Sequence, residues 1–389
     1  MIWLVLIATT AAQALATLAM LAVPVIAPTI ALAFGVDASL IGIQVSIVYG
    51  GAMLTSIIGG TLDRKWGAVR ASQAALGIGS AGLLLAILPW LFTLALGSLL
   101  ICFAYGLTNP AAAHLLTRYT PAKRRNLIFS IKQSAVPLGG MIAGLVTPPL
   151  NEAFGWRIAF AILAASLIVL AVILQSGRKA WDNDREPHIK LHVNPFAGLS
   201  VAWQNKRVRW LSGCGFFYSA VQMCVASFLV TFLVHEIGFG LVEAGLVMAL
   251  MQTGGVVGRP SWGWLADFMK NGHKVLLIIG VIAVLGSLAC FFLTPETPPL
   301  LVKLVFITLG FTAIGWNGVY LAEVARSVPK EQVSIATGGT LFFTFMGVFF
   351  GPTLFSLAYG FTQNYTATFV GLGLVTLAGM AMVWKSKKS

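Results

Sequence analysis

Long apolar stretches recur along the whole of this 389-residue chain. Many run for roughly 18 residues or more, which is enough for a helix to cross about 30 Å of hydrocarbon. They lack the alternation of polar and apolar residues that marks barrel strands, so their backbone polar groups must be satisfied within helices. Hydrophobic residues make up 58% of the sequence and charged residues 10%. The sequence therefore predicts an all-α integral membrane protein.

Charge clusters, glycine and proline breaks and span length divide the chain into about twelve transmembrane helices. They are expected near residues 4–33, 39–60, 70–91, 94–116, 126–149 and 157–176, and then near 209–234, 241–265, 274–293, 300–325, 334–360 and 366–384. One long polar segment separates the two sets of six. We predict an N-terminal six-helix bundle over 1–176, a cytoplasmic linker over 177–208, and a C-terminal bundle over 209–389 with a short basic tail.

The net charge of +13 is distributed in a way that predicts orientation. Nearly all of the 25 Lys and Arg residues fall at or near the even-numbered loops, the linker and the tail. Because basic residues concentrate on the cytoplasmic side, we expect both termini in the cytoplasm of a multi-pass protein of the bacterial plasma (inner) membrane. No segment is long and polar enough for a basic nucleic-acid-binding domain, so nucleic acid is excluded as a partner. The lipid bilayer is the expected environment.

Two short motifs recur at nearly the same offset along the chain. GGTLDRKWG, with Asp63 four residues after Gly59, matches GWLADFMKNG, with Asp267 four residues after Gly263, at an offset of 204. FAYGLTNPAAAHLLTRYTP matches FTAIGWNGVYLAEVARSVP at an offset of 208. The matches occur in order on either side of the linker, which indicates two pseudo-symmetric halves related by an axis along the membrane normal.

The loop after the second predicted helix resembles the G-x-x-x-D-R-x-G-x-R/K signature of the major facilitator superfamily, with one extra residue before its second glycine. The resemblance covers essentially the full length and implies two six-helix bundles. It assigns gating roles to the motif residues of both halves, namely Gly59, Asp63, Arg64, Gly67, Arg70, Arg118, Gly263, Asp267 and Arg326. The glycines are expected where helices approach closely.

The repeat also suggests a latch at neighbouring helix ends. Asp63 is expected to pair with Arg118, and Asp267 with Arg326, when the cytoplasmic side is closed. The alternative is that all four are solvated charges at the membrane interface.

Two basic residues are predicted inside transmembrane helices, where ionisable groups are costly and mark functional sites. Lys132 lies seven residues beyond Arg125, roughly 10 Å into its helix, and Arg259 precedes Asp267 by eight residues, roughly 12 Å. In the superfamily fold these two helices border the central cavity, which implies that the two cations bind an anion. The R-P-x-x-G run at Arg259 is similar to helix 8 of monocarboxylate transporters, although Gly255 replaces their acidic residue.

Each of these two residues has a structural alternative. Lys132 could extend its ammonium group back to the interface, and Arg259 could bind carbonyls at a helix end. Weaker candidates for substrate binding are polar residues of the helices that line the pore in this superfamily: Gln13, Asn109, Tyr218, Gln222, Asn317 and Tyr320. His114 and Glu323 are candidates for proton coupling, although a packing role for the histidine and an ion pair of Glu323 with Arg326 are open alternatives.

The residues together predict a secondary carrier for a small organic anion, such as a carboxylate, that works by alternating access and proton symport. Proton-coupled efflux of drug-like or metabolite compounds is the alternative. The sequence contains no nucleophile–base pair, metal motif or phosphate-binding loop, so we expect neither an enzyme nor a cofactor. A functional monomer is expected.

Overall fold

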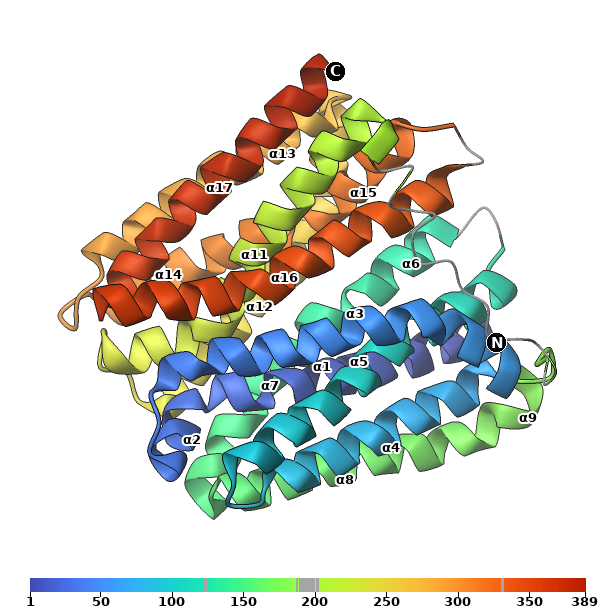
Figure 1. Ribbon diagram of the computed structural model, residues 1–389, viewed down its shortest axis with the longest axis horizontal. Helices are drawn as coiled ribbons and strands as arrows, with labels where there is room; N and C mark the ends of the chain where they lie inside the picture. Colours follow the sequence, from blue (N-terminus) through green and yellow to red (C-terminus); the bar gives the residue numbers. More distant parts are fainter. Residues whose placement is uncertain (122–124, 187, 189–199, 201–202, 330–331) are drawn as a thin grey trace. The chain divides into compact units, whose positions relative to one another are not determined.

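The computed structural model describes residues 1–121, 125–186, 188, 200, 203–329 and 332–389 (Figure 1). The side chains of 53–54, 56–61, 125–127, 130 and 334–335 are also left undescribed. Every regular element in the described ranges is helical. Ten of these helices are long and apolar enough to cross a membrane, or eleven if a bent pair counts as one span. The predicted all-α membrane fold is confirmed, with 10 or 11 spans by this measure where about twelve were expected.

The chain divides into two compact units. The first comprises Met1–Asp37 and Ile47–Val193. Its helices are α1 (Ile2–Val25), α2 (Ala27–Phe34), most of α3 (Ile41–Trp66), α4 (Ala68–Ala86), α5 (Leu91–Tyr119), α6 (Arg125–Gln133), α7 (Ala135–Phe154), α8 (Trp156–Leu174), η3 (Gln175–Gly177) and α9 (Arg178–Trp181). Within it, α4 packs on both α5 and α8, and α1 packs on α5 and α7.

The second unit comprises Ala38–Ser46 and Asn194–Ser389. Its helices are η1 (Ala38–Leu40), the start of α3, α11 (Lys206–His235), α12 (Leu241–Met269), α13 (Gly272–Ala289), η4 (Cys290–Phe292), α14 (Pro299–Leu309), η5 (Gly310–Ile314), α15 (Asn317–Arg326), α16 (Val333–Thr362) and α17 (Tyr365–Lys388). Within it, α11 packs on α16 and α17, and α13 packs on α17.

Three of the predicted helices are interrupted. The helix expected at 4–33 breaks at Ile26, between Pro24 and Pro28, into α1 and α2. The helix expected at 126–149 is divided at Ser134 into α6 and α7. The helix expected at 300–325 contains a π-helix, η5, between α14 and α15. Proline explains the first break, because it cannot donate to the helical ladder. The π turn is a common feature of functional sites.

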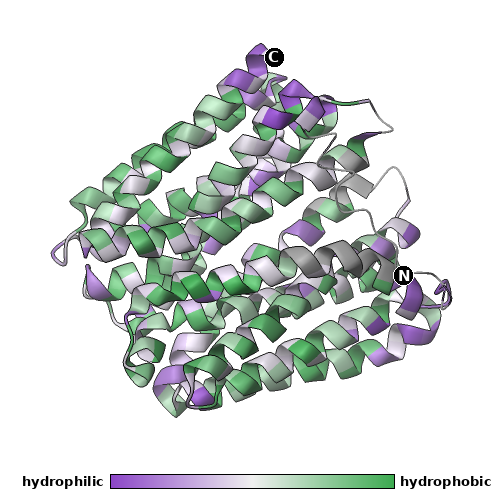
Figure 2. Cartoon of the chain, viewed as in Figure 1, coloured by the Kyte–Doolittle hydropathy of each residue, from purple (hydrophilic) through white to green (hydrophobic). Residues whose placement is uncertain are grey.

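The outer surfaces of the helices are apolar, as a bilayer requires. Large side chains such as Phe361, Leu32 and Leu374 are 90%, 86% and 73% exposed. In Figure 2 the hydrophobic residues follow the length of the helices and the hydrophilic residues gather toward helix ends. Exposed apolar side chains of this number would be unfavourable in water, so they face lipid.

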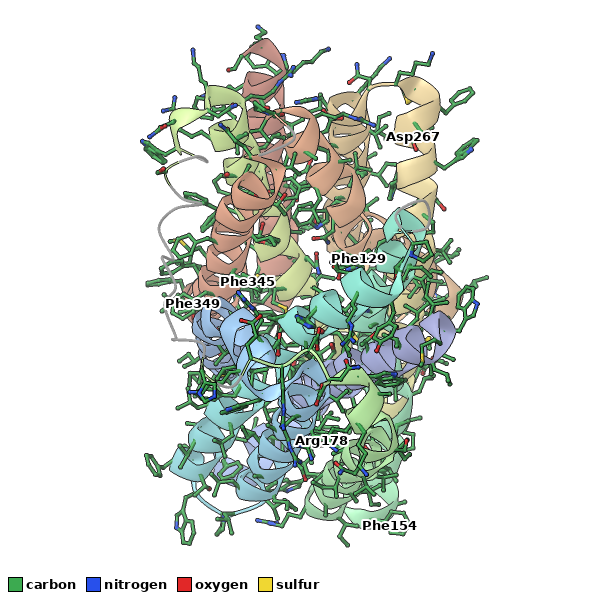
Figure 3. The ribbon with its side chains drawn as sticks, turned by 90° about the vertical axis from the view of Figure 1, so that its right-hand side faces the viewer. Phe129, Phe154, Arg178, Asp267, Phe345 and Phe349 are labelled. Atoms are coloured by element: carbon green, nitrogen blue, oxygen red, sulfur yellow. The ribbon has the colours of Figure 1, made fainter. Side chains whose placement is uncertain are left out.

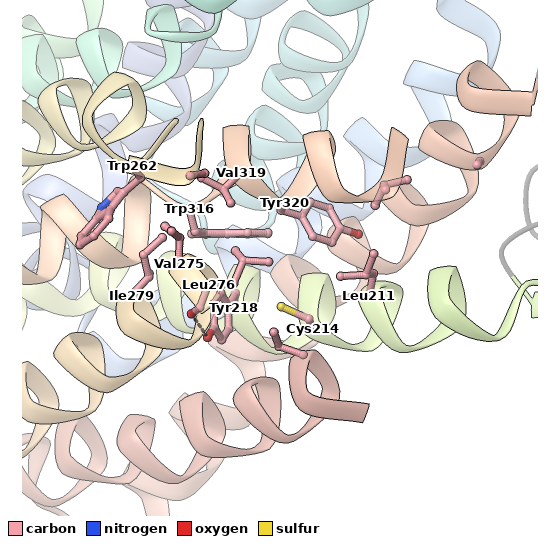
Figure 4. Packing of buried hydrophobic residues seen from close by; sticks show 14 residues of the cluster. Leu211, Cys214, Tyr218, Trp262, Val275, Leu276, Ile279, Trp316, Val319 and Tyr320 are labelled. Carbon is pink, nitrogen blue, oxygen red and sulfur yellow. Dashed lines mark hydrogen bonds between the residues drawn. The ribbon is translucent and has the colours of Figure 1, made fainter. Parts of the chain in front are cut away.

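The interior of the second unit is built around a cluster of buried aromatic and aliphatic side chains (Figure 4). Tyr218, Trp316 and Tyr320 pack edge to face at its centre. The hydroxyl of Tyr218 donates to the carbonyl of Leu276 at 2.8 Å, which satisfies its polar group inside an apolar core. All four cysteines of the chain are free and buried, as expected of packing residues.

Candidate functional site

Lys132 lies inside the first unit rather than reaching to its surface. It sits near the end of α6, is 4% exposed, and its ammonium group donates to the Oδ1 of Asn109 on α5. An amide oxygen is a good partner for a buried cation, because an unsatisfied charge there would cost several kcal/mol. The structure therefore brings together two of the predicted substrate-binding residues in one contact.

Gln13 is a third polar residue buried in this unit. It lies on α1 with no exposed surface, and its Oε1 accepts a hydrogen bond from Thr108 at 3.1 Å. Its side-chain Nε2 has no hydrogen-bond partner among the described residues. A buried amide donor without a partner is uncommon and is a candidate for binding a ligand.

Arg259 in the second unit contacts the π-helix η5. Its Nε lies 3.4 Å from the carbonyl oxygen of Ile314, and Trp262, one turn along α12, donates to the carbonyl of Phe311 at 2.7 Å. A π turn displaces the normal hydrogen-bond ladder and makes carbonyls available to side chains. The carbonyl that Arg259 contacts belongs to Ile314, the last residue of η5, which is the kind of contact that the structural alternative describes.

Gln222 on α11 connects two residues that follow the π-helix. Its Oε1 accepts from Trp316 Nε1 at 3.0 Å and from Asn317 Nδ2 at 3.1 Å. Two of the predicted substrate-binding residues, Gln222 and Asn317, thus contact each other. Trp316 completes this group and was not predicted, because its aromatic ring is indistinguishable in sequence from ordinary core packing.

Tyr218 and Tyr320 belong to the buried core of this unit, at 4% and 1% exposure. A cavity of about 10 Å³ adjoins Tyr218 and Trp316, and it has room for no more than one water molecule. It is too small for a substrate. Both tyrosines therefore pack against neighbouring helices in this structure, and their proposed contact with substrate stays a prediction.

The signature loop of the first unit is organised around Asp182, which the sequence reading had placed in the linker. Its carboxylate accepts hydrogen bonds from the backbone amides of Val69 at 2.8 Å and Arg70 at 3.1 Å, at the start of α4. Burial raises the pKa of Asp182, and the two amide hydrogen bonds oppose that rise. Gly67 precedes this turn at φ +95°, where a Cβ would lie 2.3 Å from the Asp182 side chain. Only glycine fits this position.

The other motif residues of the first unit differ from one another in their contacts. Asp63 is 1% exposed, and neither of its carboxylate oxygens has a hydrogen-bond partner in the described part of the chain. Arg64 forms a bidentate contact with Glu186, both distances being 2.9 Å. Gly59 lies in the part of α3 whose side chains are not described.

The predicted pair between Asp63 and Arg118 is not formed in this structure. Arg118 instead binds Asp184 at 2.9 Å, and His114 binds the same carboxylate at 2.9 Å. The segment after α8 therefore supplies the acid that the repeat pattern had assigned to Asp63. Asp184 could have been found only from tertiary structure, since it lies 66 residues beyond Arg118.

The corresponding pair of the second unit is formed. Arg326 lies 3.4 Å from Asp267, which stands at the end of α12 (Figure 3), and 2.7 Å from Glu323. Glu323 also binds His273 at 2.7 Å, and both of these side chains are 8% exposed. Glu323 thus pairs with Arg326, as the ion-pair alternative expected, and it also contacts the imidazole of His273. His273 was missed in the sequence because it stands alone at the start of α13.

Gly263 differs from the expectation for a motif glycine. A Cβ built at Gly263 would have no neighbour within 4 Å, so no helix approaches closely there. The Asp267–Arg326 contact itself is exposed, with side-chain exposures of 80% and 51% for the two residues. Exposed ion pairs contribute about 0–1 kcal/mol to stability. The contact therefore links the ends of α12 and α15 without adding much to the free energy of unfolding.

The family model of the Major Facilitator Superfamily matches residues 9–352. The chain belongs to this superfamily. Relatives of the chain are named as transporters, and its described residues contain ten candidate membrane spans. A probable nitrate/nitrite transporter, NarK2 of Mycobacterium tuberculosis, is 28% identical over 63% of the chain and 60% of its own length. The chain thus aligns with less than two thirds of that relative.

A second relative aligns over more of its length. The cis,cis-muconate transport protein of Acinetobacter baylyi is 25% identical over 88% of the chain and 82% of its own length. Among solved structures, a bacterial homolog of the human lysosomal transporter Spinster, in an inward-facing and unoccupied conformation, has a TM-score of 0.80 at 17% identity and covers 99% of the chain and 97% of its own. At this identity the likeness shows the fold alone.

Proposed function

We propose that this superfamily member carries a small organic anion, with a carboxylate group, across the plasma membrane by alternating access and proton symport. The observation that carries the proposal is the buried Lys132, whose ammonium group lies against Asn109 inside a membrane-spanning unit. A buried cation in a membrane protein is costly and is kept for a function. A carboxylate is the group that forms the strongest hydrogen bonds with an ammonium.

Arg259 supports the same substrate class from the second unit. It is half-buried on α12, with its Nε directed to the carbonyl of Ile314. The Nε contact already holds the guanidinium in one orientation. Less side-chain entropy is therefore lost when it binds a carboxylate. Relatives named for nitrate/nitrite and cis,cis-muconate transport also support an anionic substrate.

The coupling and orientation belong to the same proposal. With the basic residues on the cytoplasmic side, both termini face the cytoplasm. The gradient that drives uptake is a proton gradient. Glu323 and His114 are the candidates for the coupling proton. Each is bound to a partner, Glu323 to His273 and His114 to Asp184, so a proton could change these contacts directly. The functional unit is proposed to be a monomer.

Uptake into proteoliposomes tests the substrate class. We expect accumulation of labelled carboxylates, with cis,cis-muconate as the first probe, and a fall of at least about tenfold in Lys132→Ala and in Arg259→Ala, because each change removes more than about 1.4 kcal/mol of charge-assisted binding. Lys132→Arg should retain part of the uptake. Lys303→Ala is the matched control, since it removes a cation that pairs with Glu243.

The alternative, proton-coupled efflux of drug-like or metabolite compounds, makes the opposite prediction. Purified protein would then be stabilised against heat by hydrophobic cations and by none of a panel of organic acids. Wild-type uptake of carboxylates that is unchanged in both alanine variants would also contradict the anion proposal.

A further inference from the structure

One end of the second unit carries a dense group of basic and aromatic side chains, formed where the start of α11 meets the end of α17. These two helices pack against each other. Ser386 on α17 donates to the carbonyl of Arg207 on α11 at 3.1 Å, which fixes the two ends together. The basic residues are Lys206, Arg207, Arg209, Lys385, Lys387 and Lys388, and the aromatic residues are Trp203, Trp210 and Trp384. We call these nine residues the basic-aromatic patch.

Within the described residues, no acidic side chain pairs with the positive charge of the patch. None of its six cations forms an ion pair with a carboxylate of the described residues, and the sequence contains no Asp or Glu over 203–235 or 365–389. Three basic residues at other helix ends differ in this respect. Arg64, Arg118 and Arg326 each contact an acidic side chain within 3.4 Å. Six like charges in one place attract an external anion.

The tryptophans of the patch contact three of its six cations. The guanidinium carbon of Arg209 lies 5.6 Å from the ring centre of Trp203 and 5.9 Å from that of Trp210. The ammonium of Lys385 lies 4.6 Å from Trp210, and that of Lys388 lies 3.5 Å from Trp384. Tryptophan prefers the headgroup level of a bilayer, so the patch lies where lipid phosphates lie.

An exposed apolar stripe leads along α17 to the patch. Leu374, Leu377, Ala381 and Trp384 follow one another at helical spacing on one face, and Lys388 continues the same face one turn later. Leu374 is 73% exposed, Leu377 47% and Trp384 51%. The stripe has the shape that an acyl chain needs, and its end has the charge that a phosphate needs.

We infer that the basic-aromatic patch binds the phosphate headgroup of an anionic diacyl phospholipid, with an acyl chain along the stripe of α17. A soluble anion would use the charge alone, whereas a lipid uses both the charge and the apolar stripe. Under the orientation proposed above, the patch faces the cytoplasmic leaflet, whose surface carries negative charge. The site is separate from the residues proposed to bind substrate.

Native mass spectrometry of the detergent-purified full chain tests this inference. The probes are phosphatidylglycerol and phosphatidylcholine with the same acyl chains, each titrated separately. We expect the anionic lipid to bind at least about tenfold more tightly, because each cation near an anionic headgroup contributes to the preference. The triple variant Lys385→Gln, Lys387→Gln, Lys388→Gln should lose most of this preference, and the corresponding Lys→Arg triple variant should keep it.

A charge-matched control separates the patch from net charge. Arg178→Gln, Lys179→Gln, Arg185→Gln removes three cations of the first unit and should leave the lipid preference in place. Equal binding of the two lipids by the wild type, or an unchanged preference in the Lys→Gln triple variant, would overturn the inference. Displacement of the lipid by equimolar glycerol 3-phosphate would overturn the role of the stripe. If the triple variant cannot be purified folded, Lys385→Gln and Lys388→Gln alone decide the question.

Discussion

At the scale of single residues, the signature loop shows two carboxylates with opposite roles. Asp182 is buried and accepts two backbone hydrogen bonds at the start of α4. Asp63 is more deeply buried, and its carboxylate accepts no hydrogen bond from the described residues. The negative charge of Asp182 repels a negative charge on Asp63. Asp182 therefore stabilises the loop, as anions at a helix N-terminus do, and Asp63 costs free energy in this conformation.

Asp63→Asn should therefore raise the thermal midpoint of the purified protein. An amide avoids both an unpaired buried charge and the repulsion by Asp182, a gain on the order of 1 kcal/mol. Scanning fluorimetry in detergent measures it. Asp267→Asn is the control, since the side chain of Asp267 is 80% exposed, and it should change the midpoint little. A lower midpoint in Asp63→Asn would show that the carboxylate has a stabilising partner.

At the scale of elements, helix interruptions determine where polar groups can bind. The π-helix η5 begins at Gly310, which lies so close to α12 that a Cβ there would clash with the carbonyl oxygen of Met251. This close approach brings α12 beside η5 and allows Arg259 and Trp262 to reach its carbonyls. The position of Arg259 thus depends on a glycine 51 residues further along the chain.

Gly310→Ala tests this dependence. The added methyl group must push α12 away from η5, and such overpacking typically costs about 1–3 kcal/mol. We expect a lower thermal midpoint together with weaker carboxylate uptake. Gly371→Ala, where a Cβ would meet nothing within 4 Å, serves as the control and should behave like the wild type. Equal midpoints for the two variants would mean that the α12–η5 approach can relax freely.

At the scale of the whole molecule, the proposed orientation can be tested with the cysteines already present. Cys102, Cys214, Cys224 and Cys290 are at most 2% exposed, so a membrane-impermeant maleimide should not label the wild type. Glu296→Cys, in the turn before α14, should be labelled in intact cells. Ser389→Cys, at the end of the chain, should be labelled only in inside-out vesicles. Labelling of Ser389→Cys in intact cells would contradict a cytoplasmic C-terminus.

The sequence was sufficient for the all-α membrane class and for the superfamily, because span length and motif order depend on local residue types. Polar residues within apolar spans stand out by composition, and the structure pairs Lys132 with Asn109 and Gln222 with Asn317. Their role in substrate binding stays a prediction. The breaks at Ser134 and in η5 were not predicted. The first lies just before Pro137, which cannot donate to the carbonyl of Gln133. The second contains no proline, and α12 packs against it.

Local sequence alone determined which segments cross the membrane, because each must satisfy its own backbone hydrogen bonds in lipid. Only the tertiary structure decided which acids contact Arg118 and the start of α4. Asp182 and Asp184 lie in a polar segment that looked like a featureless linker, yet they cap α4 and bind Arg118. Ion pairs act over a few ångströms in space, and no spacing along the chain encodes a contact between segments more than 60 residues apart.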